Sequence, residues 1–291
     1  MSFTTAQAFD KFYDAVKLDA ATEHKVVQRR DRVVEVLQKA FPSTSTMRYI
    51  DSHIIGSMGR KTASKPFEDI DVMVHLAVDA ELWRNRYVSN SSEFLSRVRT
   101  SLNSTSTVQK VGARGQAVRL FYTDGLIVDV AAVVKYNTGG YGIPGGSGQW
   151  LTTDPLQHGQ YITERNIQLG NRLRRFVVIA KQWNKAHSSR LSSFHLEMLA
   201  ARTFSTLGRD TRDGLRKFFN HNIHNLTVPD PAGHSVDLSS YLTPTACSAV
   251  HTSMTAARDR ADLALSAEKR GDHAEAIRHW RIILGAQFPT G

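Results

Sequence analysis

The spacing of apolar residues predicts two helices at the start of the chain. Residues 5–41 follow a helical pattern, with a break expected near residues 18–21. The second part carries one apolar stripe at helical spacing, formed by Val26, Val33, Leu37, Ala40 and Phe41. A helix with one such stripe packs that side against a protein core and leaves the opposite side to solvent.

Between residues 48 and 135 the pattern changes to short apolar runs that are typical of β-strands. These runs are residues 47–55, 70–76, 117–122 and 126–134. The last two flank Thr123-Asp124-Gly125, and Asp-Gly between two apolar runs predicts a β-hairpin. Residues 80–102 are expected to be helical, and the glycine-rich segment 139–148 is expected to be a loop.

From residue 163 onward the pattern is helical. A long helix is expected to present one apolar face, formed by Leu169, Leu173, Phe176, Val177, Ala180 and Trp183. Further helices are expected at residues 192–206, 215–220, 243–269 and 272–285. The sequence therefore predicts an α+β protein, in which a lobe with a mixed sheet precedes an α-helical lobe. We expect the domains to be residues 1–160 and 161–291.

The composition excludes several classes of protein. Hydrophobic residues make up 41% and charged residues 22% of the 291 residues, so a core can form and a wholly disordered chain is excluded. Cys247 is the only cysteine, which excludes a disulfide framework and a cysteine-rich zinc site. The sequence contains neither a membrane-spanning apolar segment nor the apolar run of a signal sequence. We therefore expect a soluble cytoplasmic protein without a membrane partner.

The net charge of +10 favours an anionic partner or substrate, such as a nucleotide or a nucleic acid. One sector of the second helix carries four cations, namely Lys25, Arg29, Arg32 and Lys39. This sector is either a solvated helix face or a surface that contacts nucleic acid. No aromatic residue interleaves the cations, so we favour the solvated face and do not expect a nucleic-acid activator.

Three aspartates in predicted strands are candidates for metal binding. Asp69 and Asp71 are two residues apart, so both side chains lie on the same face of a strand. Asp129 lies within an apolar run, where an unpaired charge would be costly. We expect an antiparallel neighbouring strand to bring it beside the other two. Mg²⁺ prefers such hard carboxylate oxygens, and a site of this kind can hold two metal ions.

Gly56 and Ser57 follow the first predicted strand and are candidates for phosphate binding. Glycine lets a phosphate approach the backbone, while the serine hydroxyl and the N–H groups of a following helical turn can donate to its oxygens. Each motif alone is unspecific, because Asp-x-Asp is commonly a solvated strand edge or a turn. The combination of the Gly-Ser turn with the three strand aspartates favours a catalytic interpretation.

This combination resembles the nucleotidyltransferase superfamily that includes DNA polymerase beta and poly(A) polymerase. Within it, the chain is most similar to the cyclic-oligonucleotide synthases of bacterial antiphage defence, which are relatives of cyclic GMP-AMP synthase and 2′-5′-oligoadenylate synthetase. Later elements that match this branch are Tyr141-Gly142-Ile143-Pro144, Trp150, Thr153-Asp154-Pro155, Lys181-Gln182-Trp183-Asn184 and Ser193-Phe194-His195-Leu196-Glu197. The resemblance covers roughly residues 50–200 and departs from the family at Gly145, where an acidic residue is expected.

The resemblance implies a DNA polymerase beta-like fold with two lobes and the active site in the cleft. It implies that two Mg²⁺ ions, or Mn²⁺ in their place, are held by the catalytic residues Asp69, Asp71 and Asp129. It also implies nucleotide contacts from Gly56, Ser57, Lys181, Ser193 and Phe194. The residues themselves leave alternatives open: Lys181 extending from a packed helix to water, Ser193 capping a helix, and Phe194 packing in the core.

The implied activity is synthesis of a cyclic di- or oligonucleotide second messenger from ATP, with GTP as a further candidate substrate. A ribose hydroxyl attacks the α-phosphorus of the donor, pyrophosphate leaves, and the product reaches a downstream effector in antiviral defence. One alternative is a nucleotidyltransferase that modifies an RNA, a protein or a small-molecule acceptor. Another is a nucleic-acid-binding protein on a degenerate enzyme fold, against which the three intact aspartates argue.

Overall fold

The computed structural model describes residues 3–67, 69–235 and 237–290, and in it the chain forms two compact units. The sheet unit comprises Leu18–Arg60 and Phe67–Gly159. The helical unit comprises the chain up to Lys17, the segment Lys61–Pro66 and the chain from Gln160 onward. This grouping differs from two consecutive domains divided at residue 160, because the first helix and residues 61–66 pack with the C-terminal helices.

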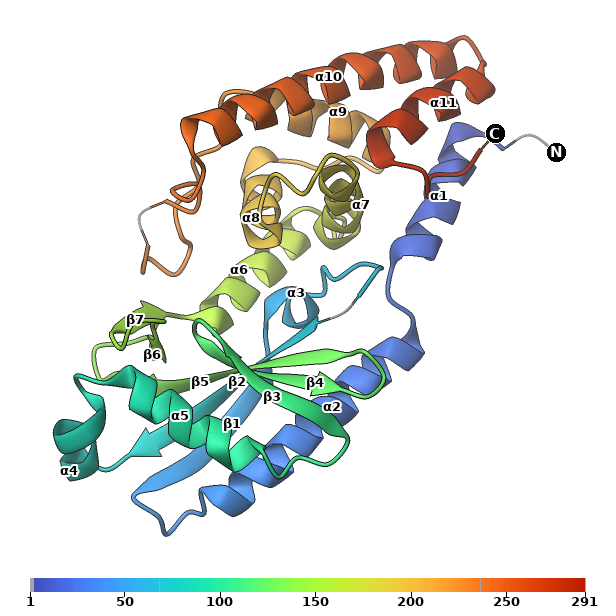
Figure 1. Cartoon of the computed structure of the whole chain (residues 1–291). Helices are drawn as coiled ribbons and strands as arrows, with labels where there is room; N and C mark the ends of the chain where they lie inside the picture. The colour runs from blue at the N-terminus through green and yellow to red at the C-terminus, as the bar shows by residue number, and fades with distance from the viewer. Residues whose placement is uncertain (1–2, 68, 236, 291) are drawn as a thin grey trace. The chain divides into compact units, whose positions relative to one another are not determined.

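A mixed sheet forms the centre of the sheet unit (Figure 1). Its strands lie in the order β1 (Met47–Ile54), β2 (Asp69–Val78), β5 (Ile127–Lys135), β4 (Ala117–Tyr122) and β3 (Val108–Arg114). β2 and β5 run parallel, whereas the other neighbours in this order run antiparallel. The expected hairpin is confirmed as the β4–β5 connection, where Gly125 has a φ of 84°. The α+β fold with a mixed sheet is likewise confirmed.

Alternation along the strands separates an apolar face of the sheet from a face that carries aspartates. Ile70, Val72 and Val74 are fully buried and join one core with helices α2 (Ala20–Ala40) and α5 (Ser91–Leu102). Asp69 and Asp71 alternate with these residues and therefore point to the opposite face. Strand periodicity thus fixes which side of the sheet is available for chemistry.

The helix break expected near residues 18–21 is confirmed. α1 (Thr5–Val16) ends before Lys17, and α2 begins at Ala20. The Asp19 side chain caps α2 by accepting a hydrogen bond from the Thr22 N–H at 2.8 Å.

Part of the segment 139–148, expected to be a loop, is a strand. β6 (Tyr141–Pro144) pairs with β5 and with β7 (Trp150–Thr153). Gly142 lies inside β6, and a Cβ at this position would lie 2.3 Å from the Tyr136 hydroxyl. The glycine therefore serves close packing within a strand, which sequence patterns do not distinguish from a loop glycine.

Two other parts of the sheet unit also differ from expectation. β3 was not expected, because its sequence Val108–Arg114 contains few apolar residues and it lies at the edge of the sheet. The helical stretch expected over residues 80–102 is divided into α4 (Ala80–Leu82), a π-helical turn (Trp83–Tyr87) and α5.

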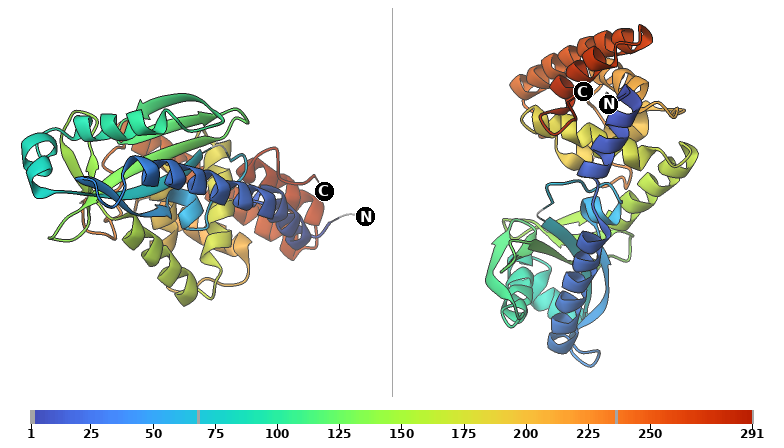
Figure 2. Two further views of the ribbon diagram at one scale, coloured as in Figure 1. Left: turned by 90° about the horizontal axis from the view of Figure 1, so that it is seen from below. Right: turned by 90° about the vertical axis from the view of Figure 1, so that its right-hand side faces the viewer.

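The helical unit is formed mainly by α1 and the C-terminal helices. These are α6 (Pro155–Gln168), whose residues from Gln160 belong to this unit, α7 (Leu173–Ala186), α8 (Ser193–Thr203), α9 (Thr211–Asn222), α10 (Pro244–Lys269) and α11 (His273–Leu284). α10 and α11 lie side by side, as the labels of Figure 1 and the right-hand view of Figure 2 show. The long helix expected from Leu169 to Trp183 begins only at Leu173, because Gly170 and Asn171 adopt positive φ values of 66° and 60°.

None of the helices in the described ranges is long and apolar enough to cross a membrane.

Candidate active site

The candidate carboxylates lie next to one another at the start of the two parallel strands. In the register of β2 and β5, Asp71 pairs with Asp129 and Asp69 pairs with Ile127. Asp129 alternates with the fully buried Val128 and so shares the sheet face of the other two aspartates. The expected antiparallel neighbour is wrong: the chain crosses over before β5, and parallel pairing brings both strand starts to one edge.

The Gly56-Ser57 turn lies beside these carboxylates. The end of β1 meets the start of β2, and the Ile55 N–H donates to the Asp71 carbonyl at 2.9 Å. The following residues form one helical turn, α3 (Gly56–Gly59). Gly56 has a φ of 62°, and a Cβ there would lie 1.9 Å from Asp71 Oδ2. Only glycine adopts this backbone conformation readily and leaves room for the carboxylate.

Arg119 on β4 is the direct partner of Asp129. The two residues are opposite each other in the antiparallel register of β4 and β5. The Arg119 Nε donates to Asp129 Oδ1 at 2.7 Å, and Nη2 donates to Oδ2, so the contact is bidentate. The hydrogen bond to Asp129 raises the pKa of Arg119 above its usual value. This pair satisfies the charge of Asp129 in an otherwise apolar strand.

The surroundings of Asp71 disfavour the negative charge of its carboxylate. Burial and, to a smaller extent, the negative charges of Asp69 and Asp129 raise the pKa of Asp71 to about 6, with Arg60 and Arg119 partly offsetting them. A carboxyl in this environment is more readily neutralised than one in water, unless a cation is close.

The donor set suits a hard divalent cation. Among residues 3–67, 69–235 and 237–290, no three His, Cys, Asp or Glu side chains are already gathered as a ligand set. Arg119 engages both oxygens of Asp129, and the other two carboxylates repel Asp71. A divalent cation removes that repulsion and accepts the same oxygens. The three aspartates therefore fit such an ion by chemistry and by their shared face.

Lys181 is the residue that the family resemblance implies as a phosphate ligand. It is a buried residue of α7. Its Nζ lies 2.7 Å from Glu197 Oε1 on α8 and donates to the Thr62 carbonyl at 2.9 Å. The Lys181 side chain is 5% exposed and that of Glu197 is 0% exposed. In this structure the ammonium contacts protein groups, so a phosphate has to join or replace them.

Lys181 belongs to a set of α7 side chains that hold the segment Lys61–Pro66. Lys185 Nζ donates to Ser64 Oγ and to the Lys65 carbonyl, both at 3.1 Å, and Gln182 Nε2 donates to the Lys65 carbonyl at 3.2 Å. The Lys65 N–H donates to the Val16 carbonyl of α1 at 2.7 Å. α7 and α1 thus fix the backbone that continues from the Gly56-Ser57 turn.

Ser193 and Phe194 lie in the first turn of α8. Ser193 is exposed and is not the helix cap, because the Ser192 side chain accepts from the His195 N–H at 3.2 Å. Phe194 is partly buried and packs against the core of the helical unit. Ser193 precedes Glu197 by four residues and so lies on the same side of α8 as the partner of Lys181.

Sequence reasoning missed two residues that the structure places against predicted ones. Arg119 is one of them. A hairpin centred on Asp124 pairs residue 119 with residue 129, so the predicted hairpin already implies that Arg119 lies opposite Asp129. Glu197 is the other: an acidic residue among apolar helix positions indicates a buried partner, which here is Lys181.

The basic sector of α2 is largely paired within the sheet unit. Lys25 and Arg29 lie 3.2 and 2.9 Å from Asp124 Oδ2. Arg32 and Lys39 both contact Glu35, at 2.5 and 2.9 Å. These contacts agree with a solvated, internally neutralised helix face.

Comparison with solved structures identifies the fold. CdnC of Escherichia coli MS115-1, solved with ATP, matches with a TM-score of 0.77 and covers 97% of this chain and 98% of that chain. The sequence identity is 19%, so this likeness concerns the fold. A mixed sheet together with C-terminal helices is the architecture that this likeness covers.

The family follows from the sequence comparisons. The model of the Second Messenger Oligonucleotide or Dinucleotide Synthetase domain matches residues 3–166, more than half of the chain, and the protein belongs to this family. A probable cyclic nucleotide synthase of Bacillus cereus (strain VD146) is 26% identical over 328 residues, covering 99% of this chain and 98% of the relative. A cyclic AMP-AMP-AMP synthase of Acinetobacter sp. (strain ATCC 27244 / 9458) is 26% identical over 259 residues, covering 83% and 73%. The protein is a nucleotidyltransferase that makes a cyclic di- or oligonucleotide second messenger.

Proposed function

We propose that this protein joins ATP, alone or with GTP, into a cyclic product at Asp69, Asp71 and Asp129, within an antiviral signalling system. The observation that carries the proposal is the β2–β5 register, which pairs Asp71 with Asp129 and keeps Asp69 on the same face. The Gly56-Ser57 turn lies against these residues, where its backbone N–H groups and the Ser57 hydroxyl can donate to phosphate oxygens.

The proposed reaction is the attack of a ribose hydroxyl on the α-phosphorus of a bound triphosphate. A new phosphodiester bond forms, the α–β anhydride bond breaks, pyrophosphate leaves and the hydroxyl proton is released. Asp69, Asp71 and Asp129 would hold two Mg²⁺ ions, or Mn²⁺ in their place, which would supply a lower pKa for the attacking hydroxyl and positive charge for the leaving pyrophosphate. Ring closure requires at least one further attack of the same kind on another α-phosphorus.

The protein's own residues contribute position and charge. Gly56 leaves room for Asp71, and Arg119 holds Asp129 in a fixed orientation. In the helical unit, we propose that Lys181 and Ser193 bind the triphosphate and that Phe194 stacks on the base. The buried Lys181–Glu197 pair supports a defined position for the ammonium, although the pair has to rearrange to admit a phosphate.

The proposed reaction is tested by identifying its product. Purified protein is incubated with all four ribonucleoside triphosphates and Mg²⁺, and the products are analysed by mass spectrometry. A cyclic oligonucleotide formed without an added acceptor is the expected result. Nucleotides attached only to an added RNA, protein or small molecule would contradict the proposal and favour the alternative acceptor.

The carboxylate assignment is tested by the double substitution Asp69→Ala with Asp71→Ala. Synthesis should fall below detection, because both metal-binding carboxylates on β2 are lost. Without divalent ions the melting temperature should stay equal or rise slightly, since like charges on one face are removed. Asp124→Ala is a suitable control, because it removes an aspartate of the same sheet unit that lies outside the site. Substantial synthesis by the double variant would contradict the assignment.

A further inference from the structure

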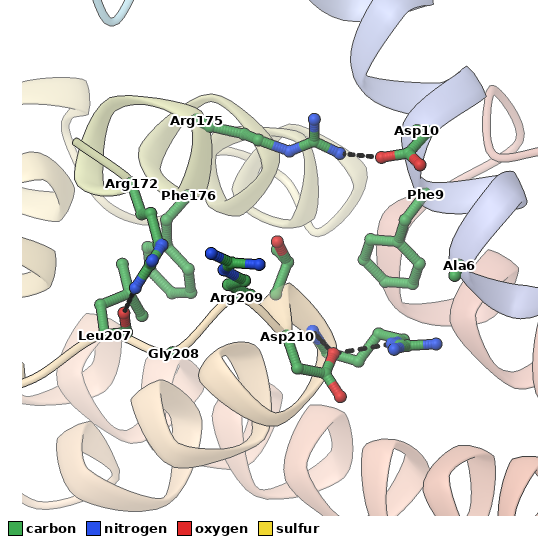
Figure 3. Close-up of a pocket in the computed structure, with 12 residues that line it drawn as sticks. Ala6, Phe9, Asp10, Arg172, Arg175, Phe176, Leu207, Gly208, Arg209 and Asp210 are labelled. Atoms are coloured by element: carbon green, nitrogen blue, oxygen red, sulfur yellow. Dashed lines mark hydrogen bonds and ion pairs between the residues drawn. The ribbon is translucent and has the colours of Figure 1, made fainter. Parts of the chain in front are cut away.

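A pocket lies wholly within the helical unit (Figure 3). It has a volume of about 420 Å³ and is formed by α1, the start of α7 and the loop that leads into α9. None of its lining residues is among those proposed for nucleotidyl transfer. The volume falls in the range of small-molecule sites.

Arginines dominate the polar lining of this pocket. They are Arg172, Arg175, Arg209 and Arg212, against the two carboxylates of Asp10 and Asp210. The lining therefore carries two more positive than negative charges. Such an excess attracts an anion.

The contacts of the arginines show where the unbalanced charge lies. Arg175 donates to Asp10 at 2.5 Å, and Arg212 contacts both Asp210 and Glu268, so these two are neutralised. Arg172 donates to the carbonyl of Leu207 at 2.9 Å, and a carbonyl does not cancel its charge.

Arg209 is exposed and makes no hydrogen bond or ion pair with any residue in the described part of the chain. In Figure 3 its side chain extends into the space of the pocket, while Arg175 reaches from α7 to Asp10 on α1. Two guanidinium groups, those of Arg172 and Arg209, are therefore available to a phosphate.

The pocket also has apolar lining residues. Phe9, Phe176 and Leu207 line it and are buried, with 3%, 2% and 5% of their surface exposed. A phosphate alone would leave most of the volume of about 420 Å³ unfilled. The lining is better matched by a molecule that joins a phosphate to a flat apolar group.

We propose that this pocket binds a small molecule of the nucleoside monophosphate class. Its phosphate contacts Arg172 and Arg209, and its base or other planar group fills the remaining volume beside the edges of Phe9 and Phe176. The site is separate from the three aspartates, so it takes its ligand without divalent ions and without turnover.

The test measures binding of AMP, inorganic phosphate and adenosine to the full chain by calorimetry, with EDTA present. AMP is expected to bind more tightly than phosphate or adenosine, because only AMP offers both groups. Arg209→Ala should weaken AMP binding at least tenfold, and Arg209→Lys should restore part of it. The control is Arg278→Ala, an exposed arginine of α11 outside the pocket, which should leave binding unchanged.

Ser57→Ala separates this site from the proposed catalytic one. AMP binding should survive this substitution, since Ser57 lies outside the pocket. AMP binding that is lost in Ser57→Ala but kept in Arg209→Ala would overturn the proposal, as would equal binding of adenosine and AMP. These readouts do not depend on synthesis, so failure here is distinguishable from failure of the proposed function.

Discussion

At the scale of single residues, Gly56 is constrained twice: by its backbone conformation and by the carboxylate beside it. Its φ is 62°, and a Cβ would lie 1.9 Å from Asp71 Oδ2. Gly125 shares the first constraint with a φ of 84°, but a Cβ there meets nothing within 4 Å. The two glycines therefore form a matched pair for separating backbone strain from steric displacement of Asp71.

Gly56→Ala is expected to abolish synthesis, whereas Gly125→Ala should retain most of it. Both substitutions impose a left-handed alanine, which costs about 1–2 kcal/mol. Only Gly56→Ala also displaces the carboxylate of Asp71. Initial rates and melting temperatures of the two variants, measured side by side, check this. Similar loss of synthesis in both would show that the close approach to Asp71 is unimportant.

Arg119 is expected to compete with metal ions for Asp129. Its bidentate contact occupies both carboxylate oxygens and places a positive charge at the site. Arg119→Gln should therefore bind Mn²⁺ more tightly in the absence of nucleotide, by about threefold or more, as read by electron paramagnetic resonance. Arg84→Gln, an exposed arginine of the same unit, is the control. Unchanged or weaker Mn²⁺ binding in Arg119→Gln would contradict the competition.

At the scale of elements, α7 and α8 are joined by a buried ion pair. Lys181→Ala alone leaves Glu197 in the core without the ammonium, and breaking a buried pair on one side costs about 3–5 kcal/mol. A weaker ATP affinity in that variant would therefore be mixed with a loss of stability. Replacing both partners by apolar residues avoids this problem, because such exchanges are often neutral or stabilising.

The double variant Lys181→Met with Glu197→Leu should melt close to the parent and bind ATP about 10- to 100-fold more weakly. The expected loss corresponds to a charge-assisted contact of about 1.5–3 kcal/mol. Lys185→Met is the control, because that lysine lies on the same helix and donates to Ser64 and to the carbonyls of Lys65 and Pro66. If the double variant bound ATP as tightly as the parent, the assignment of Lys181 to the nucleotide site would be contradicted.

At the scale of the whole molecule, the net charge of +10 raises the question of nucleic-acid activation. The cations of α2 that prompted it are paired with Asp124 and Glu35 in the sheet unit. Synthesis should therefore not require added nucleic acid.

Rates are compared with duplex DNA, with duplex RNA and after nuclease treatment. Arg29→Gln with Arg32→Gln should change the rate by less than about twofold. Stimulation of tenfold or more that disappears in this variant and at high salt would show that the sector binds nucleic acid.

Features set by local periodicity could be predicted from the sequence. The alternation of Asp69-Ile70-Asp71-Val72 places both aspartates on one strand face whatever the neighbouring strand is, since side chains alternate in every strand. The Asp124-Gly125 turn likewise specifies its hairpin through backbone conformation. The family resemblance, carried by these same residues, then indicated the class of enzyme.

Only the tertiary structure decided which distant segments meet. The parallel pairing of β2 with β5, the packing of α1 with the C-terminal helices and the partnership of Lys181 with Glu197 all join residues that no local pattern links. Gly142 shows the same limit within one strand, since the Tyr136 side chain that requires a glycine there is positioned by folding. The physical reason is that backbone geometry sets local periodicity, whereas long-range pairing depends on how buried faces and charges find complementary partners.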